Sequence, residues 1–367
     1  MNTGAARNNI LVHTVGRLAL LIDDDTLCDV TASPGREEAV AHGCAPEDIE
    51  YYFSSEDLAA VRSEPRDYLA VHETLLGRTV PPPVDSRKEA QGYVAATMTG
   101  TRGDSGHYTS IGYLLLTGGS RDRLLQDRRG YTQAFRSRRI LRAIRRPTIA
   151  RGLSCIAINL GLDGLRLLPP FLPVCRNSDG VFAAALAATL GDAHWGLLPW
   201  VIDHEPVPRR IEPLTQMWKA STGLRLGDLV IALIRRWARD ASPAPPDVRL
   251  HGLGAFLIDS MSGTRSRAAD VLEATATETI QQRLNVIDRR LESERHVPDF
   301  WAKDMTRYRR QLKSLLASDI RGLAMDVAAA VGTERARRVT CELIRSYGHL
   351  LQVWLRIRLA AEDLSLR

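Results

Sequence analysis

Three consecutive carboxylates, Asp23 to Asp25, follow directly after the apolar run Leu-Ala-Leu-Leu-Ile at residues 18–22. The run has the composition of a buried strand, so the aspartates stand at its carboxyl end, where an open α/β sheet places its ligands. Carboxylate oxygens are hard ligands that suit Mg²⁺ or Mn²⁺, and either cation can hold a diphosphate. The sequence therefore predicts a metal and diphosphate site at residues 23–25. The alternative is a plain turn with a helix cap, where runs of aspartate also occur.

The segment before this strand, residues 4–16, has the pattern of a short helix. Its apolar residues at positions 10, 11, 14 and 15 recur at helical spacing, and it ends in a glycine, which commonly terminates helices. Arg7 and Asn8 then lie near the amino end of this helix. That end is electropositive and can bind an anion, so both side chains are candidates for the same ligand site.

The order of Arg7, Asn8 and the three aspartates resembles the A-R-N … D-x-D element of GT-A glycosyltransferases, especially the large family 2-type group. In that family the Asp cluster binds a divalent metal and the diphosphate of a nucleotide sugar, and the Arg-Asn pair lies near the nucleotide. The resemblance implies that Asp23 and Asp25 bind Mn²⁺ or Mg²⁺ and that Asp24 lies against the nucleotide sugar. It also implies that Arg7 and Asn8 lie at the nucleotide.

A second polar turn, Arg-Asn-Ser-Asp at residues 176–179, follows a proline-rich segment and opens a predicted helix. Ser178 or Asp179 would cap that helix if the turn has only a structural role. Family 2-type enzymes carry an acidic motif, often Glu-Asp, at the comparable place, and its Asp acts as general base on the acceptor hydroxyl. The resemblance therefore implies that Asp179 is the base, which a sugar hydroxyl requires at neutral pH. Ser178 stands where the family often has an acid.

A third polar group, Asp-His-Glu-Pro at residues 203–206, closes the apolar run 197–202. In several GT-A enzymes a downstream histidine completes the metal shell, and His204 resembles that residue. The alternative is an ordinary polar residue at the end of a strand.

The segment Gly100–His107 is predicted to be a flexible polar loop that follows a strand at residues 93–99. Its three glycines allow close approach of the backbone to a ligand. Asp104, within this loop, is assigned to the donor site on the same reasoning. An ordinary mobile loop is the alternative. A second core strand is expected at residues 154–160.

Positive charge is concentrated in one stretch of the chain. Residues 121–151 contain eleven arginines, two aspartates and no glutamate, whereas the net charge of the whole chain is +6. The simplest interpretation is a solvated basic face on two short amphipathic helices. The functional alternatives are attraction of a phosphorylated donor or acceptor, or peripheral contact with an anionic membrane. Nucleic acid is an unlikely partner, because no recognisable nucleic-acid-binding module accompanies the arginines.

Composition sets broad limits on the class of protein. A hydrophobic content of 44% and a charged content of 25% are those of a globular protein. The five cysteines form no CxxC pair, which argues against a zinc site or a disulfide framework and favours a reducing compartment. No apolar run reaches the roughly 18 residues that a membrane-spanning helix needs, so a cytoplasmic location is expected.

The pattern of the chain changes near residue 210. Residues 1–210 are predicted to form a GT-A-like α/β catalytic domain, and residues 211–367 an α-helical carboxyl-terminal domain with helices at 265–295, 312–331 and 339–355. A GT-A domain has a βαβαβ unit before its D-x-D strand, which takes on the order of 60 residues. Only 22 residues precede Asp23. We therefore expect a partial nucleotide-diphospho-sugar transferase sheet that lacks the amino-terminal part of its nucleotide-binding unit.

Together these patterns imply metal-dependent transfer of a sugar from a nucleoside-diphosphate sugar donor to the hydroxyl of an unknown acceptor. Inversion at the anomeric carbon is implied by the resemblance alone. Two other functions fit the same residues. The Asp cluster suits nucleotidyl or phosphoryl transfer, which also uses metal-bound phosphates. The other alternative is a non-catalytic helical scaffold with a vestigial transferase domain.

Overall fold

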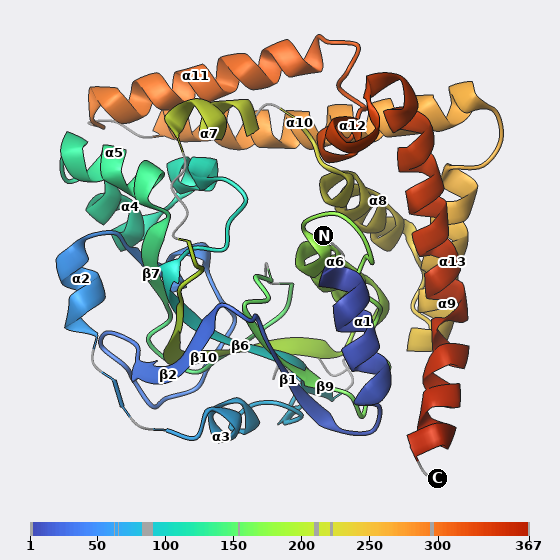
Figure 1. Ribbon diagram of the computed structural model, residues 1–367, viewed down its shortest axis with the longest axis horizontal. Helices are drawn as coiled ribbons and strands as arrows, with labels where there is room; N and C mark the ends of the chain where they lie inside the picture. The colour runs from blue at the N-terminus through green and yellow to red at the C-terminus, as the bar shows by residue number, and fades with distance from the viewer. Residues whose placement is uncertain are drawn as a thin grey trace.

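The computed structural model describes residues 3–61, 63–64, 66–82, 91–152, 155–208, 213–220, 223–293 and 297–365. Within these residues ten strands form one mixed sheet, and helices pack beside it and continue into a helical carboxyl-terminal region (Figure 1). The predicted α/β class with a helical carboxyl-terminal region is therefore confirmed. The predicted domain boundary at residue 210 lies outside the described residues.

The strands are β1 (Leu18–Ile22), β2 (Thr26–Ala32), β3 (Ala41–His42), β4 (Glu50–Tyr52), β5 (Thr79–Val80), β6 (Gly92–Asp104), β7 (Arg139–Ala143), β8 (Thr148–Ala150), β9 (Asn159–Asp163) and β10 (Ala193–His204). The helices of the amino-terminal part are α1 (Thr3–His13), α2 (Ser55–Ala60), α3 (Tyr68–Glu73), α4 (Gly118–Leu125), α5 (Arg128–Ser137) and α6 (Ser178–Thr189), with short 3₁₀ turns at Pro46–Asp48 and Ser110–Leu115. The later helices are α7 (Leu214–Ala220), α8 (Leu226–Asp240), α9 (Pro246–Ser260), α10 (Arg265–Ser293), α11 (Asp299–Leu316), α12 (Met325–Val331) and α13 (Thr333–Ser365).

The centre of the sheet is the parallel pair of β6 and β10. The main strand order is β1-β9-β6-β10-β8-β3, with β2 paired to β10 and β7 paired to β6. Nearly every residue of β6 and β10 is buried, because helices and loops cover both faces. Such strands read as continuous apolar runs in the sequence, which is why the run 197–202 predicts the last part of β10, although the strand continues through His204.

The strand before the three aspartates differs from the prediction in one respect. β1 has the predicted bounds, but it is an edge strand paired antiparallel with β9 and is not a buried strand of a parallel sheet. Leu18 and Ile22 at its two ends are 40% and 38% exposed, whereas Leu21 is buried. A short apolar run cannot distinguish an edge strand from a central one, because partner strands are not encoded locally. The aspartates still follow the carboxyl end of β1.

The segment predicted as a flexible loop is mostly strand. β6 continues through Asp104, so the prediction of a loop at Gly100–His107 is wrong for its first five residues. Two of its glycines allow strands to pack closely: a Cβ at Gly100 would clash with the carbonyl oxygen of Arg142, and Gly103 has a φ of 107°. The second core strand is also displaced, since β9 begins at Asn159 and residues 153–154 lie outside the described residues.

The helical region packs against α6 and extends the core away from the sheet. One continuous apolar core runs from β6 and β10 through α6 to α8, α9 and α10. α10 confirms the predicted long helix, and α13 contains the predicted helix at 339–355. The apolar stripe at 312–331 belongs to two helices, because α11 ends at Leu316 and α12 starts at Met325. Among the described helices none has the length and apolar character required to cross a membrane.

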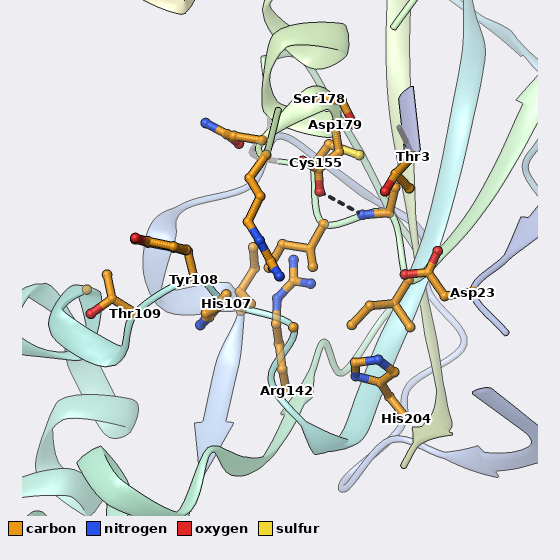
Figure 2. Close-up of a pocket in the computed structure, with 18 of the residues that line it drawn as sticks. Thr3, Asp23, His107, Tyr108, Thr109, Arg142, Cys155, Ser178, Asp179 and His204 are labelled. Carbon is orange, nitrogen blue, oxygen red and sulfur yellow. Dashed lines mark hydrogen bonds between the residues drawn. The ribbon is translucent and has the colours of Figure 1, made fainter. Parts of the chain in front are cut away.

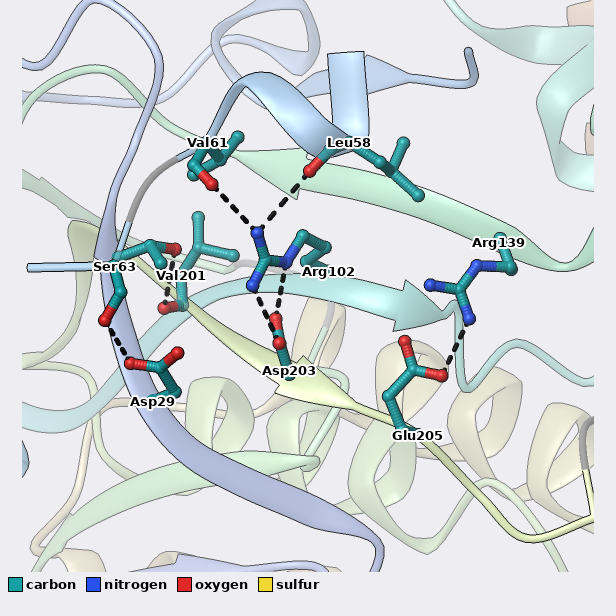
Figure 3. A network of polar contacts seen from close by, with 10 residues as sticks. Asp29, Leu58, Val61, Ser63, Arg102, Arg139, Val201, Asp203 and Glu205 are labelled. Atoms are coloured by element: carbon teal, nitrogen blue, oxygen red, sulfur yellow. Dashed lines mark hydrogen bonds and ion pairs between the residues drawn. The ribbon is translucent and has the colours of Figure 1, made fainter. Parts of the chain in front are cut away.

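A bidentate ion pair joins the two central strands beside α2. Arg102 on β6 donates from Nε and Nη2 to both carboxylate oxygens of Asp203 on β10, at 2.6 and 2.7 Å (Figure 3). Its Nη1 donates to the carbonyl oxygens of Val61 and Leu58, at 2.9 and 3.4 Å. Both charged side chains are less than one-fifth exposed, so this guanidinium fixes the end of α2 against the sheet.

Replacing Arg102 by lysine is expected to lower the free energy of unfolding by about 1–2 kcal/mol. Lysine keeps the charge but cannot donate to both carboxylate oxygens and two carbonyls at once. The matched control is Arg139→Lys, because Arg139 makes a single contact of 2.7 Å with Glu205 and is 36% exposed (Figure 3). That control should change stability by about 0.5 kcal/mol or less. Equal effects of the two variants in urea titrations would contradict the bidentate interpretation.

Candidate functional site

A cavity of about 850 Å³ opens beside the carboxyl ends of β1 and β10 and at the amino end of α6 (Figure 2). We call it the central cavity. Its size is within the range of small-molecule sites. Six of the eight site residues predicted from the sequence line it: Arg7, Asp23, Asp24, Asp25, Asp179 and His204. They belong to α1, to the turn between β1 and β2, to α6 and to β10.

Backbone hydrogen bonds fix the turn that carries the three aspartates. The amide of Glu205, just after β10, donates to the carbonyl oxygen of Asp25 at 2.8 Å. The amide of Asp23 donates to the carbonyl oxygen of Ile158 at 2.9 Å, just before β9 begins. The turn is therefore held between the end of β10 and the segment 155–158, which also lines the cavity.

Arg7 joins three of the cavity-forming segments. Its Nη2 donates to Asp23 Oδ1 at 3.1 Å and to the carbonyl oxygen of Ala157 at 2.7 Å, and its Nη1 donates to Ser178 Oγ at 3.4 Å. The residue is 8% exposed. Burial raises the pKa of the Asp23 carboxyl, and the Arg7 guanidinium opposes that rise. The Arg7 guanidinium therefore compensates the charge of the half-buried Asp23 carboxylate.

The contact between His204 and Asp25 is the part of the cavity that best fits a metal ion. His204 Nε2 lies 2.9 Å from Asp25 Oδ1, and His204 Nδ1 donates to the carbonyl oxygen of Asp104 at 2.7 Å. A carbonyl oxygen only accepts, so Nδ1 carries a proton and Nε2 is the ring atom that faces the carboxylate. A histidine anchored through one ring nitrogen in this way is the usual arrangement of a metal ligand.

The predicted trio of metal ligands is only partly brought together. Asp23 contacts Arg7, and among the described residues no group of three or more His, Cys, Asp or Glu side chains could hold a metal ion. Asp25 and His204 can supply two ligands. Mg²⁺ and Mn²⁺ commonly bind through one or two protein side chains and complete their shells with water and phosphate oxygens. A diphosphate and water would therefore have to provide the remaining ligands.

Asp179 lies in the first turn of α6 and lines the cavity (Figure 2). One carboxylate oxygen accepts the amide of Ala157 at 3.1 Å, and the other accepts the amide of Gly180 at 3.0 Å. These bonds fix the orientation of the carboxylate, and each oxygen keeps a further lone pair for another donor. The residue immediately before α6 is Asn177, so neither Ser178 nor Asp179 occupies the capping position considered above.

Asn8 and Asp104 are not among the described residues that line the cavity. The Asn8 side chain donates to the carbonyl oxygen of Phe171 at 2.9 Å and accepts the amide of the same residue at 2.7 Å, which ties α1 to the segment before α6. The Asp104 carboxylate is 5% exposed and forms a bidentate ion pair with Arg138, at 2.9 and 2.8 Å. Both residues support the site from outside it, Asp104 through its carbonyl contact with His204.

The cavity has further residues that were not among the predicted site residues. Arg142 on β7 and Arg225 just before α8 line it together with His107 and Tyr108. The Arg225 guanidinium lies 4.4 Å from the centre of the Tyr108 ring, so the helical region contributes to the cavity wall. Burial, together with nearby Arg142 and Arg138, lowers the pKa of His107 to about 4, so its ring is neutral at pH 7. His107 ends the segment Gly100–His107, which the sequence predicts to approach a ligand. No motif identifies the other three, and Arg142 is one of eleven arginines in its stretch.

Comparisons of the chain with protein-family models, with curated proteins and with solved structures give no match. The residues of the cavity and their geometry are therefore the basis for inferring a function.

Proposed function

We propose that this protein transfers a sugar from a nucleoside diphosphate sugar to a hydroxyl group of an acceptor. The supporting observation is that Arg7, the aspartates 23–25, Asp179 and His204 line one cavity although the chain separates them widely. The sequence assigns them to three parts of this reaction: Asp23, Asp25 and His204 to the metal, Arg7 and Asp24 to the donor, and Asp179 to the acceptor. If these residues belonged to a plain turn, a cap and a polar strand end, nothing would require them to face a common space.

The donor would occupy the end of the cavity formed by the turn after β1. Asp25 and His204 are the residues that would hold Mn²⁺ or Mg²⁺, and Asp24 would contact the nucleotide sugar. When bound, such an ion neutralises the charge of the departing diphosphate. Arg7 donates hydrogen bonds to Asp23 and to the carbonyl oxygen of Ala157. These bonds would hold the cavity wall in place before the donor binds.

The acceptor hydroxyl would be deprotonated by Asp179. As its oxygen bonds to the anomeric carbon, its proton passes to the Asp179 carboxylate and the bond from that carbon to the diphosphate oxygen breaks with its electron pair. A single displacement of this kind inverts the anomeric configuration. The backbone amides of Ala157 and Gly180 hold the carboxylate in place for this transfer.

Thermal unfolding in the presence of UDP, GDP and their sugars, each with and without Mn²⁺, tests the donor site. A ligand at about a hundredfold over its dissociation constant should stabilise the protein by about 2.7 kcal/mol. We expect one nucleoside diphosphate to raise Tm in the presence of Mn²⁺, and we expect Asp25→Asn to lose this shift. Asp122→Asn is the matched control, because Asp122 is 69% exposed and lies outside the cavity.

Two results would contradict the proposal. A larger shift with nucleoside triphosphates, followed by turnover of the triphosphate, would favour nucleotidyl or phosphoryl transfer. Absence of any shift in wild type, with Asp25→Asn indistinguishable from wild type, would favour a non-catalytic scaffold.

A further inference from the structure

Arg142 is a buried cation that projects into the central cavity (Figure 2). The residue is 7% exposed and lies on β7, two residues after Ile140, which shares its face of the strand and belongs to the apolar core. An apolar side chain would be expected at this position of β7. The guanidinium therefore replaces an apolar group at a place where burial of a charge is costly.

Within the described part of the chain, the Arg142 side chain has no hydrogen bond or ion pair, and its Nε is buried without a partner. The other arginines of the cavity differ in this respect. Arg7 pairs with Asp23, and Arg225 lies 3.6 Å from Asp228. Arg151 and Arg176 also make contacts of their own.

Three titratable groups on which the Arg142 charge acts, His107, Cys44 and Cys155, provide no negative charge at neutral pH. His107 is neutral, because burial and the neighbouring arginines lower its pKa to about 4. Burial raises the pKa of Cys44 and of Cys155, so both thiols are protonated. Three carboxylates that act on the same groups have other partners: Asp104 pairs with Arg138, Asp48 accepts the amide of Ala45, and Asp179 accepts the amides of Ala157 and Gly180. Among the described residues no ion pair joins Arg142 to a carboxylate, so its buried charge gains a direct partner when an anion enters the cavity.

We propose that Arg142 binds an anionic group of the acceptor, a phosphate or a carboxylate, inside the central cavity. The assignment to the acceptor rests on the proposed function. Guanidinium is suited to both anions, because it donates two parallel hydrogen bonds to their oxygens. An acceptor held by its anion at Arg142 would place its hydroxyl for deprotonation by Asp179.

The charges that act on the buried Cys155 thiol are those of Asp179, Arg7 and Arg142. Arg142 therefore lies in the same cavity region as the proposed base and as the arginine that pairs with Asp23. The experiment must distinguish an anion of the acceptor from the diphosphate of the donor.

The test uses the full chain and measures Tm at low ionic strength with inorganic phosphate or acetate as probe, before and after saturation with the nucleoside diphosphate and Mn²⁺. The variants are Arg142→Met, Arg142→Lys and the control Arg129→Met, an exposed arginine on α5. We expect at least one probe to raise Tm of wild type and of Arg129→Met, with or without nucleotide. Arg142→Met should lose that shift, keep the nucleotide shift, and have a ligand-free Tm equal to or above that of wild type. Arg142→Lys should keep part of the probe shift.

Three outcomes would overturn the proposal. Absence of a probe shift in wild type, or an equal shift in Arg142→Met, would show that Arg142 binds no anion. A ligand-free Tm of Arg142→Met well below wild type would show that the guanidinium is already compensated in the protein. Loss of the probe shift when nucleotide is bound, together with loss of the nucleotide shift in Arg142→Met, would assign Arg142 to the donor diphosphate.

A wild type that binds phosphate through Arg142 but binds no nucleotide would refute the proposed sugar transfer and leave the anion site in place.

Discussion

Replacement of Arg7 by alanine should lower the free energy of unfolding by about 3 kcal/mol. The change removes three hydrogen bonds that join α1 to Asp23, to the carbonyl oxygen of Ala157 and to Ser178. It also leaves the Asp23 carboxylate half-buried without its cation. We expect a loss of free energy at the low end of the range measured when one partner of a buried ion pair is removed. The reason is that the Asp23 side chain is 35% exposed, so water can partly solvate its charge.

The loss of stability should depend on pH in a defined direction. Burial already raises the pKa of Asp23, and removal of Arg7 would raise it further. A carboxyl whose pKa is higher in the folded than in the unfolded protein destabilises the fold as pH rises through that pKa, and the loss is recovered on acidification. The difference between wild type and Arg7→Ala should therefore be largest at neutral pH and narrow towards about pH 4.

Urea titrations at several pH values measure both effects, and Arg17→Ala is the control. Arg17 follows the same helix, but it is exposed, so its removal should change stability by about 0.5 kcal/mol or less at every pH. A loss in Arg7→Ala that is constant with pH would show that the contact with Asp23 contributes little. The hydrogen bonds to Ala157 and Ser178 would then account for the stability that Arg7 provides.

The elements around the cavity were predictable because each has a strong local signal. The apolar run before Asp23 forms β1, and the run that ends at His204 forms the end of β10. The helix predicted after the turn at residues 176–179 is α6, although it begins at Ser178, a residue that was expected to cap it. The site prediction was based on polar residues directly after such runs, because the ends of strands and helices commonly face solvent or a ligand.

Pairing between strands has no such signal. β1 pairs antiparallel with β9, across more than a hundred residues of chain, and nothing in its five residues indicates this partner. The glycines at 100 and 103 predict a loop, although both lie in β6 and allow its close packing against β7 and the end of β10. A glycine required for close approach looks the same in the sequence whether the neighbour is a ligand or another strand.

Arg142 shows the same limit for a functional residue. In the sequence it is one arginine of a basic stretch, and the simplest interpretation was a solvated face. The structure divides that stretch: Arg129 and Arg136 are exposed on α5, Arg145 pairs with Glu50, and Arg142 is buried in the cavity. Arg142 differs from the other arginines of the stretch because its side chain points from β7 into the cavity. Which side of a strand faces the cavity depends on how the strands pair in the sheet.

Asp179→Asn should lower kcat by about 10²- to 10⁴-fold, the usual contribution of a general base. Asparagine has nearly the same shape, and its carbonyl oxygen can still accept one of the two amides that Asp179 accepts from Ala157 and Gly180. The loss of the other bond should cost about 1 kcal/mol of stability. The Tm shift caused by nucleoside diphosphate and Mn²⁺ should remain, because the variant removes the base and leaves Asp25 and His204 intact.

The measurement is the release of nucleoside diphosphate from the nucleotide sugar that binds wild type, with KM for the donor determined separately. Ser178→Ala is the matched control, because it changes the neighbouring residue of the same helical turn and removes only the 3.4 Å contact from Arg7. That variant should keep kcat within about threefold, since its contact is weak and lies outside the proton transfer. A kcat of Asp179→Asn within tenfold of wild type would mean that Asp179 only orients the start of α6. A large loss of kcat in Asp179→Asn alone, with KM for the donor unchanged, would mean that the Asp179 carboxylate acts on the acceptor. A structural defect at the start of α6 would instead raise KM for the donor as well, because Ser178 in that turn contacts Arg7.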